Sequence, residues 1–290
     1  MIDNTNRTIE GEFHDSLQAD LIWLTDNGSL RPEATLSLRR LSMGVSQKLG
    51  REVSPVSLLH SSKIDPERLG GIEAKTFERS VKAAYEADRN NIWIQPLFFG
   101  PSAALTEYLP ERIRVLSKKR PGLQVKIAPA LVPNDAETPR WMLEVLGDFA
   151  CMLLEKHPEI SQWILLDHGS PKQAVAEVRD RVAADFKKFW SQKFPEHRVS
   201  PASMERRDGD AYAFSEPLLE NVPIACECQQ GDVGVLMLFF LPGRHAGPHG
   251  DVANIIKGVE ERFPRLRMHM SALFCEHPKL VDILAEKIGG

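Results

Sequence analysis

The sequence predicts an α/β protein of two tandem doubly wound domains with parallel sheets, flavodoxin-like in type and related by an internal duplication. Three observations predict it. Short apolar segments of strand length alternate with longer amphipathic segments, as in parallel strands joined by crossover helices. Short motifs of the first half recur in the second half in the same order. The 290 residues suffice for two domains of ordinary size.

Three pairs of segments carry the repeat. They are LTDNGS at 24–29 with LLDHGS at 165–170, PLFFGP at 96–101 with MLFFLP at 237–242, and VSPVS at 53–57 with VSPAS at 199–203. The first two pairs are 141 positions apart and the third is 146 apart, a difference that a change of loop length would absorb. The alternative to duplication is chance, because buried strands are built from the same few apolar residue types. Three matches in the same order favour duplication.

The first half contains four expected strands and four expected helices. The strands are 21–25, 53–59, 92–98 and 125–128, and the helices are 32–49, 72–87, 104–118 and 139–155. The helical pattern breaks at Lys156–Glu159, where Pro158 cannot continue a helix. We therefore expect an N-terminal domain over 1–158 and a C-terminal domain over 159–290.

The second half repeats this alternation. Its expected strands are 163–166, 198–204, 233–240 and 267–270, and its expected helices are 171–193, 216–226, 251–263 and 278–288. Each half should therefore be an open sheet covered by helices on both faces.

Composition narrows the function classes. Hydrophobic residues make up 42% and charged residues 26%, and the net charge of -4 gives no basic field for nucleic acid. The polar start, residues 1–12, lacks a signal peptide, and the longest apolar run, 233–242, is too short to span a membrane. We expect a soluble, cytoplasmic protein without a nucleic-acid or membrane partner.

The four cysteines are too few and too irregularly spaced for a disulfide framework, which favours a reducing compartment. Cys226 and Cys228 form a C-x-C pair, which is weak evidence for a metal site and more often a pair of half-buried thiols.

Ligands of an open parallel sheet bind beyond the carboxyl ends of its strands. The first strand of the second half is followed by His168, and Gly169 then permits a tight turn. Ser170 and Pro171 suit a helix start. The third strand is followed by a Gly- and Pro-rich loop that holds His245. Because first and third strands are neighbours in doubly wound sheets, we expect His168 and His245 to face each other.

Two imidazoles across one cleft suit a divalent borderline metal and also the removal of protons near neutral pH. His249, in the same loop, is either a third metal ligand or an exposed loop residue. Asn27 takes the place of His168 in the first half, and Ala104 takes that of His245. The first half thus lacks the pair and would be a scaffold, a wall of the cleft or a dimer surface. His157 and His197 are expected to face solvent, and His269 to be structural.

These residues resemble a known family. His168-Gly169-Ser170 after a strand, then Leu238-Phe239 with a Gly243-x-His245 loop and Asp251 opening a helix, is similar to the class II tetrapyrrole chelatases, the sirohydrochlorin cobaltochelatase and ferrochelatase family. Long members of that family carry two such domains. Met237 departs from the usual Pro before Leu-Phe, and the loop after His245 is longer than in short members.

The resemblance implies a lyase-type metal chelatase. His168 and His245 would be catalytic, and they would bind the metal together with His249. Sirohydrochlorin would lie between the two halves. Its carboxylates would meet the substrate-binding candidates, which are Ser170, Glu205, Arg206, Arg207, Gly243 and Arg244.

By this resemblance the metal would be a substrate, with cobalt(II) the first expectation and iron(II) the next, for cobalamin or siroheme synthesis. No organic cofactor is expected, and no iron–sulfur cluster, because residues up to Gly290 include no Cys-rich or His-rich tail. A non-catalytic tetrapyrrole or metal carrier of the same fold, a flavodoxin-like anion binder and a homodimer stay open alternatives.

Overall fold

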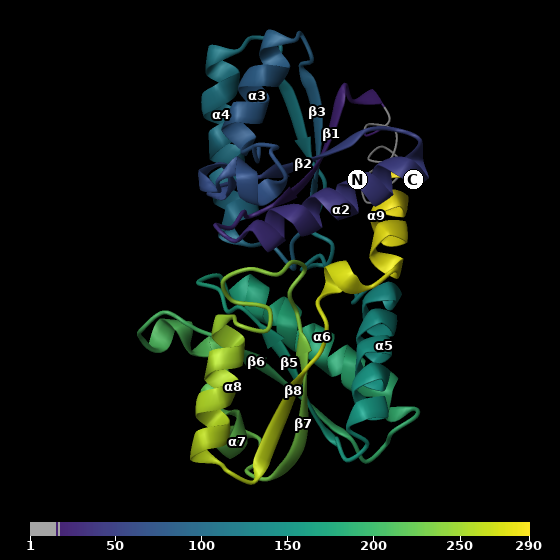
Figure 1. Ribbon diagram of the computed structural model, residues 1–290, viewed down its shortest axis with the longest axis vertical. Helices are drawn as coiled ribbons and strands as arrows, with labels where there is room; N and C mark the ends of the chain where they lie inside the picture. Colours follow the sequence, from purple (N-terminus) through teal and green to yellow (C-terminus); the bar gives the residue numbers. More distant parts are fainter. Residues whose placement is uncertain (1–15, 17) are drawn as a thin grey trace, which may run out of the picture. The chain divides into compact units, whose positions relative to one another are not determined.

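The computed structural model describes residue 16 and residues 18–290 as two compact units, each built on its own four-stranded sheet (Figure 1). The first unit comprises the described residues up to Phe98 together with Ala104–Leu131 and Pro278–Gly290. The second comprises Phe99–Ala103 and Val132–His277. The polar segment 1–12 lies outside the described residues.

Both sheets are parallel and share one strand order. The first has the order β2-β1-β3-β4, from β1 (Leu21–Asp26), β2 (Val53–Ser57), β3 (Asn91–Pro96) and β4 (Gln124–Ile127). The second has the order β6-β5-β7-β8, from β5 (Gln162–Asp167), β6 (Arg198–Ser203), β7 (Gly231–Met237) and β8 (Leu266–Met270). The predicted pair of doubly wound parallel sheets is confirmed.

Helices cover both faces of each sheet (Figure 1). In the first unit α2 (Pro32–Leu49) and α9 (Lys279–Gly289) form one layer, and α3 (Phe77–Glu86) and α4 (Leu109–Lys119) form the other. In the second unit the layers are α5 (Arg140–Lys156) with α6 (Gln173–Ser191), and α7 (Val222–Ala225) with α8 (Asp251–Arg262). Short helical turns lie at Ser61–Lys63, Pro66–Leu69, Ala104–Tyr108, Asp210–Ser215, Leu219–Asn221 and Phe274–Glu276.

The strand register reproduces the sequence repeat. Val53 lies opposite Ile22, and Val199 lies opposite Trp163, so the first strands correspond at 141 positions and the second strands at 146. The third strands again correspond at 141 positions, because Ile92 pairs with Leu21 and Val233 pairs with Gln162. Compared with the first half, the second half therefore has five more residues between its first and second strands and five fewer between its second and third.

Two helices pack on the unit that lies on the other side of the repeat boundary. The last helix of the chain, α9, packs against α2, where a Cβ on Gly44 would lie 3.1 Å from the side chain of Val281. Conversely, α5 packs against α6 and β7, and a Cβ on Gly147 would lie 3.1 Å from the ring of Phe189. The division at residue 158 stays a prediction about where the sequence repeat begins again. The two compact units are divided differently, because α5 belongs to the second unit and α9 to the first.

The expected helix over 216–226 was wrong in extent. The segment forms the turn Leu219–Asn221 and the short α7, after the irregular stretch around Pro217. Pro217 and Pro223 lack the backbone N–H that a longer helix would need. At the end of α7, burial raises the pKa of the Cys228 thiol to about 11, with a further contribution from Cys226, so this thiol stays protonated at neutral pH.

His197 does not face solvent as expected. Its Nδ1 accepts hydrogen bonds from the indole N–H groups of Trp163 at 3.0 Å and Trp190 at 3.2 Å. Only 8% of its side chain is exposed, and burial lowers its pKa. This cluster fills the core between β5 and α6.

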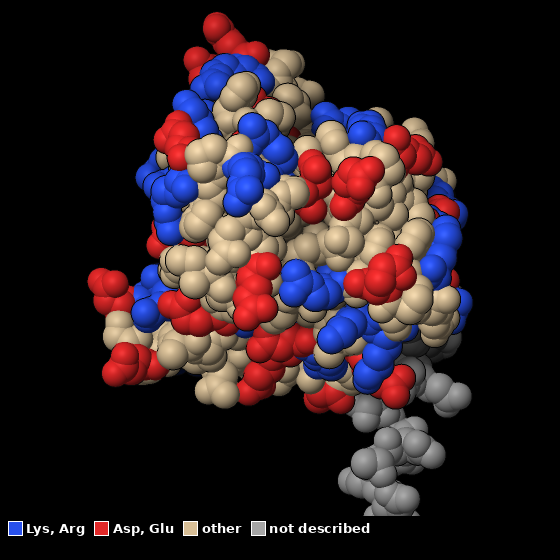
Figure 2. All heavy atoms as spheres, turned by 90° about the horizontal axis from the view of Figure 1, so that it is seen from below, with Lys and Arg blue, Asp and Glu red and all other residues tan. Residues whose placement is uncertain are grey.

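The four cysteines, all within the described residues, form no disulfide. No helix of the described chain has the length and apolar character needed to cross a bilayer. On the face shown in Figure 2, basic and acidic side chains are interspersed, without a continuous basic area.

Candidate active site

The second unit brings His168 and His245 together at the carboxyl end of its sheet. His168 follows β5, His245 lies in the loop after β7, and these two strands are hydrogen-bonded neighbours. The ring centroids lie 4.4 Å apart with the planes at 76°. The imidazoles therefore meet edge to face, close enough to share one small ion after modest rotation.

A glycine turn holds His168 in place. Gly169 has φ 88°, and a Cβ there would lie 1.8 Å from the carbonyl oxygen of Glu205. The backbone N–H of Glu205 in turn donates to the carbonyl of His168 at 3.2 Å. Only glycine fits this crossing of two chain segments. The first unit has the same turn, with Gly28 at φ 87° against the carbonyl of Leu59.

The start of α8 fixes the loop that carries His245. The backbone N–H groups of Asp251 and Val252 donate to the carbonyls of Arg244 and His245 at 3.0 and 3.1 Å. A Cβ on Gly250 would lie 2.6 Å from the carbonyl oxygen of His245, so glycine is needed here too. The side chain of Asp251 reaches back, with Oδ2 at 2.8 Å from Nδ1 of His245.

Hydrogen bonding sets the tautomer of both rings. Nδ1 of His168 lies 2.9 Å from the carbonyl oxygen of Gly169, which can only accept, so Nδ1 carries the proton. The carboxylate of Asp251 likewise accepts from Nδ1–H of His245. Each ring therefore keeps the lone pair of Nε2 available. Oε1 of Glu205 lies 3.6 Å from Nε2 of His168 and adds an anionic oxygen beside that lone pair.

The electrostatic surroundings keep His245 neutral. Burial and the neighbouring His168 lower the pKa of His245, although Asp251 and Glu205 oppose this shift. A neutral imidazole is both a metal ligand and a proton acceptor. The side chains of His168 and His245 are 43% and 31% exposed, so a substrate can reach them from solvent.

A buried arginine, which the sequence-based predictions did not include, supports the turn of His168. Oδ1 of Asp167 accepts from the Ser203 hydroxyl at 2.6 Å and from the Gly169 N–H at 3.1 Å. The Arg179 side chain, 2% exposed, lies 3.8 Å from that oxygen and also donates to Ser203. Burial raises the pKa of Asp167, and Arg179 counters the effect.

Arg179 also ties down the chain beyond Glu205. Its guanidinium donates to the carbonyls of Phe214 at 2.9 Å and Ser215 at 3.3 Å. A signal for this residue exists in the sequence, because an arginine stands within the apolar stripe of α6. The position 141 earlier is Leu38, and the buried Asp26 of that unit has no arginine partner among the described residues.

The other predicted site residues differ in their hydrogen bonds and exposure. The Ser170 hydroxyl accepts from the Lys172 N–H at 3.1 Å, and α6 begins at Gln173 rather than at Pro171. Gly243 donates its N–H to the Ala246 carbonyl at 2.9 Å within the His245 loop. His249 is exposed and makes no hydrogen bond or ion pair with the described residues.

The three predicted arginines differ in how many of their hydrogen-bond donors are already engaged within the protein. Nε of Arg206 lies 2.7 Å from Oε1 of Glu216, and its NH1 donates to two backbone carbonyls, so its donors are engaged. Arg207 lies over the Tyr212 ring at 5.9 Å. Arg244 is 75% exposed and forms one ion pair, 3.3 Å from Asp251. Arg244 and Arg207 therefore keep more donors for a ligand than Arg206 does.

The first unit offers no counterpart of the pair within the described residues. Asn27 stands where His168 does and is tied to the turn, its carbonyl accepting from the Leu59 N–H at 3.1 Å. Ala104 begins the turn Ala104–Tyr108. In the part of the chain that the structure describes, this pairing of imidazoles after neighbouring strands is therefore confined to the second unit.

Comparison with known proteins agrees with this asymmetry. The CbiX family model matches residues 162–289, the part of the chain that holds the histidine pair. A comparison with curated protein sequences finds no match.

Two solved structures share the fold. One is described as SirB from Bacillus subtilis with Fe3+, with a TM-score of 0.62 and 13% identity, covering 92% of this chain and 93% of the other. The second is described as the sirohydrochlorin chelatase SirB from Bacillus subtilis subspecies spizizenii in complex with cobalt, with a TM-score of 0.62, 12% identity and the same coverage.

Proposed function

We propose that the protein is a class II sirohydrochlorin chelatase, which inserts a divalent metal into sirohydrochlorin, because the CbiX family model matches residues 162–289. Cobalt(II) is the first candidate and iron(II) the second, for cobalamin or siroheme synthesis in the cytoplasm. The structures of the same fold, whose descriptions name cobalt and Fe3+, support a metal of this group.

The single observation that carries the proposal is the pair of Nε2 lone pairs on His168 and His245. Both rings are held with Nδ1 protonated, by Gly169 and Asp251, and the ring centroids are 4.4 Å apart. Imidazole nitrogen suits cobalt(II) and iron(II) alike. With few protein ligands the ion is held weakly enough to be passed to the tetrapyrrole, unlike an ion in a closed structural site.

Insertion exchanges two pyrrole protons for one divalent cation, so a base must receive protons while the metal enters. As the ion passes to the tetrapyrrole, the freed Nε2 lone pairs of His245 and His168 each accept one of the two protons, and Glu205 beside His168 passes protons toward solvent. We assign metal binding to His168 and His245. His249, exposed in the same loop, is the candidate for a third ligand.

The carboxylates of the substrate need cations and amide donors. Arg244 and Arg207 keep donors for them, whereas Arg206 holds the loop through Glu216. Ser170 and Gly243 contribute through the turns that carry His168 and His245.

The test mixes the purified protein with sirohydrochlorin and cobalt(II) and follows the absorbance change of the tetrapyrrole. A rate above the spontaneous one is expected. His168→Ala and His245→Ala should each reduce it by about 100-fold or more, since each removes a base and a ligand. Asn27→Ala is the matched control at the equivalent turn and should keep the rate.

The alternative is a carrier that binds the tetrapyrrole or metal without turnover. Binding of sirohydrochlorin with no rate above the spontaneous one would favour the carrier and overturn the enzyme proposal. An equal loss of rate in all three variants would overturn the assignment of the chemistry to the second unit.

A further inference from the structure

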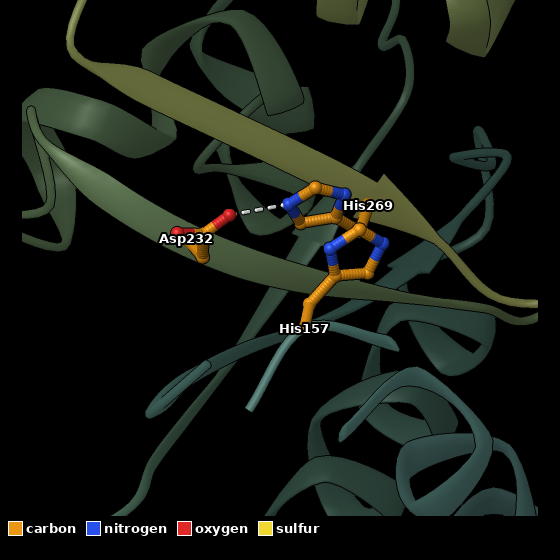
Figure 3. A group of neighbouring side chains, drawn as sticks. All are labelled: His157, Asp232 and His269. Carbon is orange, nitrogen blue, oxygen red and sulfur yellow. Dashed lines mark hydrogen bonds and ion pairs between the residues drawn. The ribbon is translucent and has the colours of Figure 1, made fainter. Parts of the chain in front are cut away.

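A second group of metal-type side chains lies in the same unit, apart from the histidine pair. Figure 3 shows His157, Asp232 and His269, which come from three different elements. His157 follows the last residue of α5, Asp232 lies on β7 and His269 on β8. One ligand atom from each of the three lies within 4.8 Å of the other two.

This group and the histidine pair occupy different levels of the sheet. Asp232 is the second residue of β7, whereas His245 follows the carboxyl end of that strand. A strand rises about 3.3 Å per residue, which puts Asp232 roughly 17 Å from the strand end at Met237. In the register, His269 lies opposite Gly234, close to Asp232. A single ion cannot contact both groups.

The contacts leave ligand atoms available. Nε2 of His269 lies 2.6 Å from Oδ1 of Asp232, as the dashed line in Figure 3 marks. The rings of His157 and His269 stack with centroids 3.6 Å apart and planes at 19°. The His157 ring makes no hydrogen bond with any described residue, although it is only partly exposed. A half-buried imidazole with its nitrogens unbonded, beside a second imidazole and a carboxylate, has the donor set of a metal site.

We propose that His157, Asp232 and His269 bind a second divalent transition metal, of the zinc or cobalt(II) class. Two imidazole nitrogens and one carboxylate oxygen fill three positions of a tetrahedral or five-coordinate ion, and water fills the rest. The lone pairs of the stacked rings lie in planes only 19° apart and do not converge on one point, so the rings must open by rotation about the Cβ–Cγ bonds. The proton of His269 then moves from Nε2 to Nδ1, and Nε2 binds the ion.

Such an ion would cross-link the end of α5 with the strands β7 and β8. Since β8 is the edge strand of this sheet, the link would hold the edge against opening. The side chains of His269 and Asp232 are 20% and 31% exposed, which allows an ion to enter from solvent. This site goes beyond the proposed function, because it touches neither His168 nor His245.

The test uses a His168→Ala/His245→Ala protein, from which the first pair is absent. Titration with cobalt(II), read by its visible absorption, and with zinc(II), read by calorimetry, should give one bound ion per chain and a higher Tm. His157→Asn, Asp232→Asn and His269→Asn in this background should each weaken binding by at least about tenfold. His60→Asn is the control, because His60 is exposed and Asn tolerates its positive φ of 63°.

Absence of a bound ion in the His168→Ala/His245→Ala protein would overturn the proposal, as would full binding in the three Asn variants. Melting of the metal-free variants shows that each is folded. In the wild-type background, His269→Asn should keep the metal-insertion rate. This separates the second site from the proposed function, since either one can fail without the other.

Discussion

Nδ1 of His245 lies 2.8 Å from Oδ2 of Asp251, the first residue of α8. The carboxylate accepts a hydrogen bond from Nδ1–H, which leaves the lone pair on Nε2, the other ring nitrogen. The carboxylate also lies 3.3 Å from Nε of Arg244. One aspartate thus orients an imidazole and a neighbouring cation.

Asp251→Asn should move the acid limb of the pH–rate profile to lower pH. The Asp251 carboxylate raises the pKa of His245, so its removal lets the pKa fall further below the ordinary value of 6.5. Activity needs neutral His245 and is lost as pH falls through this pKa. The rate at neutral pH should fall by roughly 10- to 100-fold, because the ring loses its orientation.

The profile of kcat/KM against pH for the metal-insertion reaction measures both effects. Asp282→Asn, at an exposed ion pair on α9, is the control. An acid limb that stays in place, or moves to higher pH, would show that His245 is not the group that titrates.

Arg179→Met should destabilise the protein by roughly 3 kcal/mol or more, because Asp167 then lies buried without its cation. Urea unfolding measures the loss. Adding Asp167→Asn should recover part of it, since a neutral amide needs no countercharge. A double variant no more stable than Arg179→Met would show that lost packing, and not charge, is the cause.

Gly169→Ala should cost more activity than Gly28→Ala for a comparable loss of stability. Both glycines have positive φ, and in both a Cβ would lie 1.8 Å from a carbonyl oxygen across the turn. Only the Gly169 turn carries His168 and contacts Glu205. Unfolding curves and rates, measured below the Tm of both variants, make the comparison. Equal rates in the two variants would show that the Gly169 turn does not contribute to the reaction.

Protonation of His197 should destabilise the fold at low pH. Its Nδ1 accepts from two indole N–H groups, and burial lowers its pKa below 6.5. The unfolded chain therefore binds a proton first, and stability falls as pH decreases from about 6.5 toward the folded pKa. The stability of His197→Gln should depend less steeply on pH in this window. Urea unfolding, followed by tryptophan fluorescence between about pH 5 and 8, measures both slopes, and equal slopes would exclude His197 as the source.

The sequence predicted the fold well because its strongest signals are local and repeated. Alternation of strands and helices gives the parallel topology, and α2 was predicted with its observed bounds. His168 and His245 could be paired from sequence alone, because neighbouring parallel strands bring their carboxyl ends to one edge.

Other features depend on contacts that no local pattern records. The position of Arg179 in the apolar stripe of α6 indicates that it is buried, but its role depends on contacts with Asp167, Ser203 and the carbonyls of the 214–215 segment. His157 and His269 are far apart in sequence and meet because α5 ends beside the edge strand of the second sheet. The positions of α5 and α9 could not be predicted either, since amphipathic helices do not specify which sheet they cover.

The placement of α5 and α9 bears on how this chain can be divided. A cut at residue 158 would leave the N-terminal fragment with a helix that belongs to the second sheet and without the one that covers α2. Each fragment would then expose a bare apolar face, so neither should be soluble when produced by itself. Produced together, the two fragments should recover a folded complex, because every helix regains its sheet without the peptide bond between them.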